Sequence, residues 1–353
     1  MSTQGRSHTQ QIALTFLIAA AGTLGFWAVG GPLPFLFGPL SSCLVFALLG
    51  LQLRGFPLLS KLGRVTLGTA VGASITPALV SELPTMLASL ALIPLYILAI
   101  ALVGFPFLYR VGKLDKATAF YAAMPGGLQD MVQFGIESGG NARALSLIHA
   151  IRLLGVVVAA PFVLTLGFGV SMDRPVGIPA ADLPELELIL LLLAGLSGWK
   201  IAEHFKMFGA TVLGPMIAAT AFSLLDWIHI RPPQESLLAA QFVIGIGVGV
   251  FYTGLNFKEL KGIVLAALGY LILSGLVAIG VIWLAGFLGL TEGVEAFLAF
   301  APGGQAEMTI MAIVVGADLG FVVAHHLSRL VIVILCAPII MGAINRLFFS
   351  RRS

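Results

Sequence analysis

The chain has 353 residues, of which 59% are hydrophobic and 10% are charged, and its formal net charge is +3. Soluble domains carry about 25% charged residues, so this chain has too few charges to cover a surface in water. The composition therefore excludes a soluble enzyme, a disordered regulator and a soluble nucleic-acid binder. It predicts an integral membrane protein surrounded by membrane lipids, with no nucleic acid as a partner.

Apolar stretches recur along the whole chain, and most have the roughly 17 to 27 residues that a helix needs to cross a membrane. In the first half they cover residues 12–29, 33–53, 65–80, 83–109, 117–136 and 144–169. In the second half they cover residues 186–203, 210–228, 238–255, 262–288, 294–315 and 321–345. We therefore predict an all-α polytopic membrane protein.

The two halves of the chain repeat each other. The stretch Phe120–Met131 aligns with Phe297–Met308 at a separation of 177 residues, and both contain Pro-Gly-Gly followed by an acid and a methionine. The same register aligns two His-x-x-Arg pairs, His149–Arg152 and His326–Arg329. Such agreement at one fixed spacing indicates a tandem duplication. We predict two membrane repeats, residues 1–176 and 177–353.

Loops at equivalent positions of the two repeats carry opposite charge. Arg54, Lys61 and Arg64 follow the second apolar stretch, whereas the equivalent loop within 226–241 carries two acids and one arginine. Lys and Arg concentrate on the cytoplasmic side of a membrane, so equivalent loops lie on opposite sides. Each repeat then crosses an odd number of times, and one of its six apolar stretches does not cross.

The Pro-Gly-Gly segments, Pro125-Gly126-Gly127 and Pro302-Gly303-Gly304, are the stretches expected not to cross. Proline removes a backbone donor and glycine relaxes the backbone, so the two together interrupt a helix. We predict two inverted-topology repeats with about ten transmembrane helices and two broken or re-entrant segments. Both termini are then cytoplasmic, in the plasma (inner) membrane. About twelve full crossings in parallel repeats is the alternative.

The residues around these breaks are the candidates for a functional site. A break buried in the membrane lines a cavity or is enclosed by protein, and the helix that follows it favours anions at its N-terminus. A simple packing kink is the alternative. The candidate substrate-binding residues are Pro125, Gly126, Gly127, Gln129, Pro302, Gly303, Gly304, Gln305, His149, Arg152, His326 and Arg329.

Two acids follow the breaks and are the candidate ion-coupling groups, Asp130 and Glu307. An ionisable side chain inside a membrane segment is costly and usually has a function, although an acid in a first helical turn also stabilises the helix dipole. A buried arginine needs a carboxylate or a bound anion. A structural ion pair of Arg152 with either acid is therefore the alternative to a role in substrate binding.

Other residues give no sign of catalysis. The sequence contains no P-loop, CxxC, HExxH or nucleophile elbow, and Cys43 and Cys336 lie in apolar stretches. We expect no enzyme activity, no catalytic residues, no cofactor and no metal site. His8, His204 and His229 flank the apolar stretches and are expected to be solvated.

The paired Pro-Gly-Gly-x-x-[Asp/Glu]-Met motifs, the His-x-x-Arg pairs and the duplication resemble the membrane AbrB family over essentially the whole chain. Its members are labelled as regulators or as ammonia monooxygenases, and the sequence supports neither the regulatory role nor the enzyme activity directly. Inverted repeats with a broken helix in each half are similar to the architecture of cation/proton antiporters and bile-acid symporters. That comparison is an analogy of fold and does not by itself establish a function.

The leading hypothesis is a secondary transporter, an ion-coupled permease for a small anionic solute that binds between the two breaks. The coupling ion is H+ or Na+, and the sequence does not choose between them. The alternatives are a membrane sensor that regulates gene expression through a transporter-like pocket and, in third place, a membrane monooxygenase. The sequence leaves open whether the chain forms a homo-oligomer.

Overall fold

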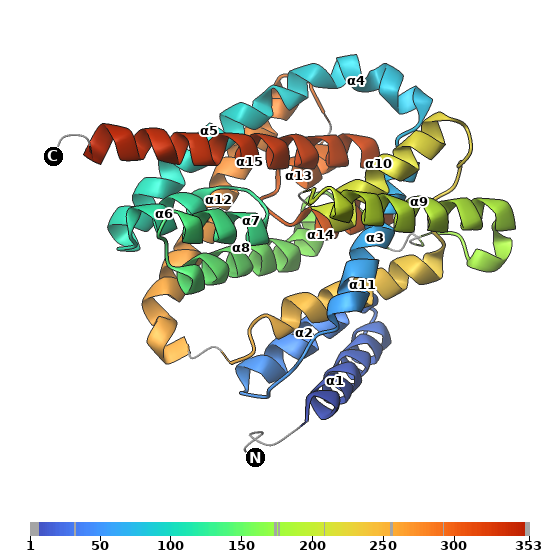
Figure 1. Ribbon diagram of the computed structural model, residues 1–353, viewed down its shortest axis with the longest axis horizontal. Helices are drawn as coiled ribbons and strands as arrows, with labels where there is room; N and C mark the ends of the chain where they lie inside the picture. The colour runs from blue at the N-terminus through green and yellow to red at the C-terminus, as the bar shows by residue number, and fades with distance from the viewer. Residues whose placement is uncertain are drawn as a thin grey trace. The chain divides into compact units, whose positions relative to one another are not determined.

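The computed structural model describes residues 7–31, 33–172, 175, 177–207, 209–254, 257–291 and 293–349. Side chains are not described at residues 78–79, 82–83, 129–130, 133, 257–260, 306 and 343–349. The candidate residues Gln129 and Asp130 therefore lie outside the described side chains. Within the described part of the chain, every regular element is a helix (Figure 1), which confirms the predicted all-α class.

The helices follow the predicted apolar stretches closely. The first repeat forms α1 (His8–Ala28), α2 (Pro34–Leu48), α3 (Pro57–Ala73), α4 (Pro77–Leu90), α5 (Leu92–Pro106), η1 (Phe107–Val111), α6 (Lys116–Ala123), α7 (Leu128–Glu137), α8 (Ala142–Phe162) and η2 (Val163–Gly167). The remainder forms η3 (Ala180–Asp182), α9 (Glu185–His204), α10 (Ala210–Leu224), α11 (Gln234–Val250), α12 (Phe257–Phe287), α13 (Gly293–Phe300), α14 (Gln305–Val315) and α15 (Leu319–Phe349).

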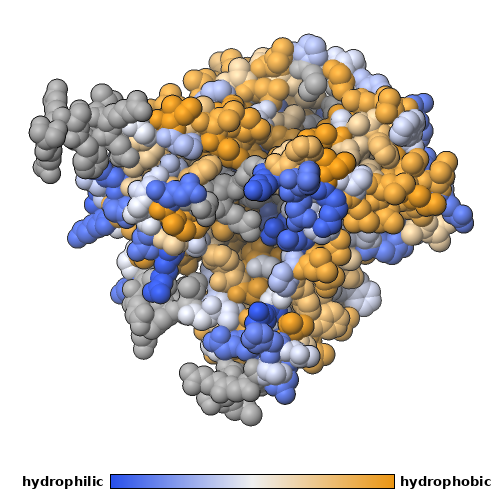
Figure 2. Space-filling model, viewed as in Figure 1, coloured by the Kyte–Doolittle hydropathy of each residue, from blue (hydrophilic) through white to orange (hydrophobic). Residues whose placement is uncertain are grey.

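Among the described residues, five helical stretches are long and apolar enough to cross a membrane. They are His8–Ala28, Pro84–Val111, Ala142–Gly167, Lys261–Phe287 and Leu319–Gly342. Large apolar side chains on them are exposed, for example Leu24 on α1 (64%), Leu102 on α5 (65%) and Ile279 on α12 (62%). Figure 2 shows apolar residues over much of the visible face, interrupted by smaller polar patches. Such a surface is suited to lipid contact and not to water.

The chain folds into two compact units, and each unit takes segments from both repeats. The first unit contains residues 1–83, 165–255 and 309–320, and the second contains residues 84–164, 256–308 and 321–353. Apart from residues 309–320 and 165–176, the segments of each unit are approximately equivalent under the sequence duplication. The two repeats therefore interlock, and neither forms a compact unit alone.

In the first unit, close helix crossings at glycine occur twice. Gly38 of α2 lies against the backbone of Thr23 of α1, where an added Cβ would meet Thr23 Cα at 2.5 Å. The equivalent glycine in the second repeat, Gly214 of α10, lies against the backbone of Gly198 of α9. Small residues let helix backbones approach closely, which favours helix association inside a membrane. Both repeats therefore use the same crossing of their first two long helices.

Further glycine contacts join the repeats to each other within this unit. Gly68 of α3 packs on the carbonyl of Val212 in α10, and its equivalent Gly245 of α11 packs on the carbonyl of Leu36 in α2. The two contacts are the same, with the repeats exchanged. Equivalent positions of the two repeats therefore make equivalent contacts across this unit.

Candidate functional site

Both Pro-Gly-Gly segments interrupt a helix, as the sequence predicts. The helix α6 ends at Ala123 and α7 begins at Leu128, with Gly127 in an extended conformation (φ −63°, ψ 140°) at the start of α7. In the second repeat, α13 ends at Phe300 and α14 begins at Gln305. All of these residues belong to the second unit. The breaks leave backbone carbonyl groups at the ends of α6 and α13 without helical donors.

The arginine of the first His-x-x-Arg pair binds these carbonyl groups in the first break. Nη1 of Arg152 donates to the carbonyl of Met124 at 3.0 Å, and Nη2 donates to the carbonyl of Gly126 at 3.2 Å. A hydrogen bond from a charged donor is about twice as strong as a neutral one. The guanidinium group therefore stabilises a backbone break that would otherwise be left with unpaired polar groups.

The second repeat builds the same arrangement at equivalent positions. Nη1 of Arg329 donates to the carbonyl of Ala301 at 2.9 Å, and Nη2 donates to the carbonyl of Gly303 at 3.1 Å. The sequence led us to expect a carboxylate or a bound anion opposite each buried arginine. Each of the two terminal nitrogens instead donates to a backbone carbonyl of the break, a pairing that side-chain identities alone do not indicate.

The histidine of each pair binds a backbone carbonyl in the short helix that precedes the break, three residues before the first carbonyl that the arginine binds. Nε2 of His149 is 3.1 Å from the carbonyl of Tyr121, and Nε2 of His326 is 2.8 Å from the carbonyl of Leu298. Because a carbonyl can only accept, Nε2 carries the proton and Nδ1 is left as an acceptor. We call each His-x-x-Arg pair, together with the carbonyl groups that it binds, a carbonyl clamp.

The side chains of both clamps are almost fully buried. Arg152 is 5% exposed and Arg329 is 6% exposed, and both histidines are more deeply buried still. Positions three residues apart lie on one face of a helix, so α8 and α15 each present a histidine and an arginine to the break. The sequence prediction that the His-x-x-Arg pairs belong to the breaks therefore agrees with the contacts, while their predicted role in substrate binding stays a prediction.

Two buried tyrosines that sequence reasoning missed complete the arrangement. Tyr96 of α5 and Tyr270 of α12 lie within electrostatic range of each other and of both arginines. We call Tyr96, Arg152, Tyr270 and Arg329 the central cluster. The two tyrosines lie in apolar stretches without a motif, and their separation of 174 residues does not match the duplication. No signal in the sequence distinguished them.

The tyrosines make different contacts with the breaks. The hydroxyl of Tyr270, from the second repeat, donates to the carbonyl of Ala123 at 2.6 Å in the first repeat. The ring of Tyr96 packs edge-on against Phe300 at 6.1 Å, and its buried hydroxyl interacts with Arg329 without a hydrogen bond of good geometry. Each tyrosine therefore lies near the break of the opposite repeat.

The acid of the second break lies in the first turn of α14. Glu307 is 5% exposed, and its carboxylate folds back over Gly304, where an added Cβ would meet Oε2. The same glycine would also meet Leu153 of α8 at 3.0 Å. The second break therefore touches the helix that carries the clamp of the first. Gln305 has a buried Nε2 without a hydrogen-bond partner.

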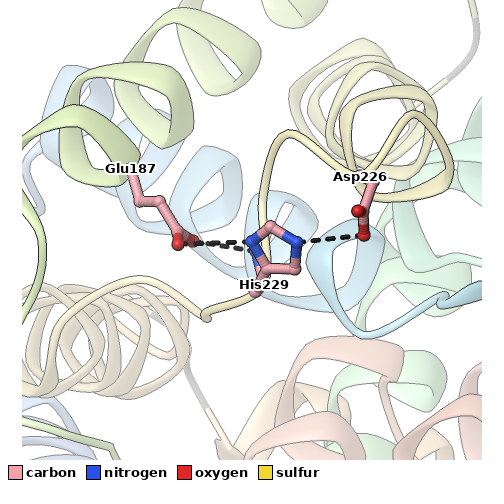
Figure 3. Close-up of polar contacts among 3 residues, drawn as sticks. All are labelled: Glu187, Asp226 and His229. Atoms are coloured by element: carbon pink, nitrogen blue, oxygen red, sulfur yellow. Dashed lines mark hydrogen bonds and ion pairs between the residues drawn. The ribbon is translucent and has the colours of Figure 1, made fainter.

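Outside the breaks, His229 forms a polar link that the sequence did not predict. Its backbone N–H donates to Oε2 of Glu187 at 2.8 Å, and its ring nitrogens lie 3.3 Å from Oε1 of Glu187 and 3.0 Å from Oδ1 of Asp226 (Figure 3). The hydrogen bonds to Asp226 and then to Glu187 raise the pKa of His229 above its usual value. His229 is exposed, as we expected for a residue that flanks an apolar stretch, but its ring is paired with two carboxylates.

The His, Cys, Asp and Glu side chains of the described residues are not grouped for metal coordination. Within that part of the chain, no three His, Cys, Asp or Glu side chains lie together in a way that could hold a metal ion. The polar groups near the breaks are instead arginine, histidine, tyrosine and a single described carboxylate. This set of groups is suited to binding an anion or moving a proton.

Comparison with known proteins places this arrangement in one family. The sequence model of the family described as "Transition state regulatory protein AbrB" matches residues 35–345. The chain is similar to the "Uncharacterized protein YhjN" of Bacillus subtilis (strain 168), with 27% identity over 300 residues, 78% of this chain and 76% of the relative. It is also similar to the "Putative regulator AbrB" of Escherichia coli (strain K12), with 27% identity over 332 residues, 92% of this chain and 93% of the relative. The chain belongs to the AbrB family.

Proposed function

We propose that the chain is an ion-coupled secondary transporter, which binds a small anionic solute between its two Pro-Gly-Gly breaks. The observation that carries the proposal is the repeated carbonyl clamp, in which equivalent His-x-x-Arg pairs hold equivalent backbone positions of both breaks. Non-helical backbone at membrane depth is tolerated only where protein encloses it or where it lines a cavity. One such break in each half of a duplicated membrane chain is characteristic of secondary transporters.

The proposal includes the direction of the repeats. The reciprocal glycine contacts of the first unit support a two-fold relation between the repeats, and the opposite charge of equivalent loops supports an axis in the membrane plane. Inverted repeats of this kind give about ten transmembrane helices with both termini on the cytoplasmic side of the inner membrane. The breaks then lie near the membrane midplane.

Glu307 is the proposed coupling group in the second repeat, and Asp130 has the equivalent place in the first. Glu307 is buried next to the break, where an ionised carboxylate is unfavourable unless a cation or a hydrogen-bond donor compensates it. Binding of H+ or Na+ neutralises the carboxylate and thereby changes the interactions that it makes in its buried position. Movement of the solute is thereby linked to the presence of the ion.

The second candidate function is a membrane sensor that regulates gene expression. The word regulator in the family description and in the name of the Escherichia coli relative favours it. A sensor would bind a solute at the same breaks but would not carry it across the membrane. The two functions therefore predict the same ligand site and differ in net flux.

The test is solute uptake by the purified full chain in proteoliposomes. With an imposed pH or sodium gradient, we expect accumulation of a radiolabelled small carboxylate, and collapse of the gradient should abolish it. Empty liposomes and liposomes that carry the Arg152→Met variant are the controls. Tight binding of the solute without any flux under either gradient would reject transport and favour the sensor.

A further inference from the structure

The two carbonyl clamps have equivalent residues but differ in one hydrogen bond. In the second clamp, Nη2 of Arg329 donates to Nδ1 of His326 at 2.9 Å. In the first clamp, Nδ1 of His149 and Nε of Arg152 are both buried and both lack a hydrogen-bond partner. In the second clamp the arginine and the histidine therefore bind each other. In the first clamp one buried donor and one buried acceptor have no partner.

The unused donor lies on a particular edge of the guanidinium group. The carbonyl groups of the break take one N–H from each terminal nitrogen of Arg152. The side edge, formed by Nε and the second N–H of Nη2, has the geometry that binds the two oxygens of a carboxylate side by side. In Arg329 this Nη2 proton goes to His326. In the first clamp, Nε on this edge has no hydrogen-bond partner, and the hydroxyl of Tyr270 is the neighbouring side-chain group that interacts with the guanidinium.

The surroundings of this edge favour a negative charge. Arg152 and Arg329 lie within electrostatic range of each other, and two buried cations so close together repel. The hydroxyl of Tyr96 lies within electrostatic range of both arginines and interacts with Arg329, and its own O–H offers a further donor. A buried donor without an acceptor is unfavourable. A planar monoanion on the side edge of Arg152 would remove the repulsion and fill the donor.

The unused acceptor narrows the class of ligand. Nδ1 of His149 accepts, because Nε2 holds the proton toward the carbonyl of Tyr121. A simple carboxylate or a sulfate ion has no proton to donate to it. An ammonium group would donate, but the two arginines repel its positive charge. A neutral hydroxyl next to the carboxylate meets both requirements, and residues three apart on a helix are close enough for a small ligand to bridge them.

We infer that Arg152 and His149 form a binding site for a small 2-hydroxycarboxylate. Its carboxylate lies on the side edge of Arg152, and its hydroxyl donates to Nδ1 of His149. The identification of this acid as the transported solute rests on the proposed transport function, whereas the binding site itself does not.

Binding is tested with glycolate, acetate, glycine and sulfate on the purified full chain in nanodiscs, by isothermal titration calorimetry. We expect glycolate to bind about tenfold more tightly than acetate, because one added hydrogen bond in a buried site contributes about that factor. Sulfate and glycine should bind more weakly than acetate. Equal affinity for glycolate and acetate would overturn the assignment of the hydroxyl to His149.

Matched variants of the two clamps locate the site. Arg152→Lys and Arg329→Lys both lose the planar fork that holds a break, so similar decreases in Tm are expected. Only Arg152→Lys removes a side edge whose Nε has no partner, and it should weaken glycolate binding by about tenfold more than Arg329→Lys does. Equal losses of affinity in the two variants would refute the first clamp as the site.

A second pair of variants keeps the test valid if the lysine variants fail to fold. In His149→Gln the amide N–H can still reach the carbonyl of Tyr121, while the acceptor at the position of Nδ1 is lost. We expect the preference for glycolate over acetate to disappear in His149→Gln and to persist in His326→Gln. Persistence in both variants contradicts the inference.

Flux measurements separate this inference from the proposed function. Glycolate that binds through Arg152 but is never carried in proteoliposomes would leave the site in place and reject transport. Gradient-driven uptake of another solute, with no glycolate binding to the wild type, would reject the site and leave transport in place.

Discussion

Nη2 of Arg329 and Nδ1 of His326 are 2.9 Å apart and three residues apart on α15. Because a guanidinium nitrogen can only donate, Nδ1 is the acceptor, and the proton on Nε2 goes to the carbonyl of Leu298. The histidine ring is therefore held as one neutral tautomer between an arginine and a backbone carbonyl. The clamp is thus a chain of hydrogen bonds in which each group fixes the orientation of the next.

The first prediction concerns the contribution of a clamp to stability. Arg152→Met keeps the unbranched stem of the side chain but removes the donors to Met124 and Gly126. Two buried carbonyl groups then lose their partners, and we expect a loss of about 2–5 kcal/mol. The control is Arg143→Met in the first turn of α8, where the arginine is exposed and a change of at most about 0.5 kcal/mol is expected. Thermal unfolding in detergent measures both, and equal losses would contradict a structural clamp.

The second prediction concerns the coupling acid. Glu307→Gln keeps the shape of the side chain but removes its charge, so it should abolish gradient-driven accumulation of the solute. Exchange of labelled for unlabelled solute without a gradient should remain, because exchange needs no net movement of the ion. Glu295→Gln, in the first turn of α13, is the matched control and should retain both activities. Accumulation by Glu307→Gln at the wild-type rate would remove this carboxylate from the coupling mechanism.

The third prediction is a pH dependence at His229. Its pKa is raised in the folded chain by Asp226 and Glu187. The link therefore contributes its full stability below the unfolded pKa of about 6.5 and loses it as the pH rises through the higher folded pKa. We expect the Tm of the wild type to exceed that of His229→Ala at pH 5.5 and the difference to shrink by pH 8.5. A difference in Tm that does not depend on pH would show that the link is not ionic. His204→Ala is the control.

The fourth prediction tests the inverted repeats. In a variant in which Cys43 and Cys336 are replaced by alanine, a cysteine at the exposed residue Ala181 should react with an impermeant maleimide added outside intact cells. A cysteine at the exposed residue Lys113, in a loop predicted to be cytoplasmic, should react only after permeabilisation. Labelling of Ala181→Cys only from the cytoplasmic side would contradict the proposed topology.

The sequence predicted the helices and their breaks where the signal is local. The Pro-Gly-Gly segments interrupt their helices because proline and glycine act on the backbone at their own positions. The stretch 83–109 was expected as one segment, and Pro84–Val111 is one candidate span, although α4 ends at Leu90 and α5 begins at Leu92 within it. Pro94 explains this division, because a helical proline cannot donate to the carbonyl four residues earlier, which belongs to Leu90.

The candidate site was only partly predictable, because its hydrogen bonds go largely to the backbone. The duplication singled out Arg152 and Arg329 as residues of interest, but every residue has a carbonyl group, and a sequence does not show which ones a helix break leaves unpaired. The tyrosines of the central cluster come from helices far away in the chain. Their positions depend on how α5 and α12 pack, which the side-chain pattern does not specify.

The reciprocal contacts of Gly68 with Val212 and of Gly245 with Leu36 also have a consequence for biogenesis. When the ribosome has completed the first repeat, the glycine face of α3 has no partner, because that partner is α10 of the second repeat. The nascent first half must therefore remain in the membrane with an unmatched small-residue surface until translation of the second half is well advanced. Assembly of this unit is thus a late event in synthesis, and a chain truncated near its midpoint would expose that surface to quality-control proteases.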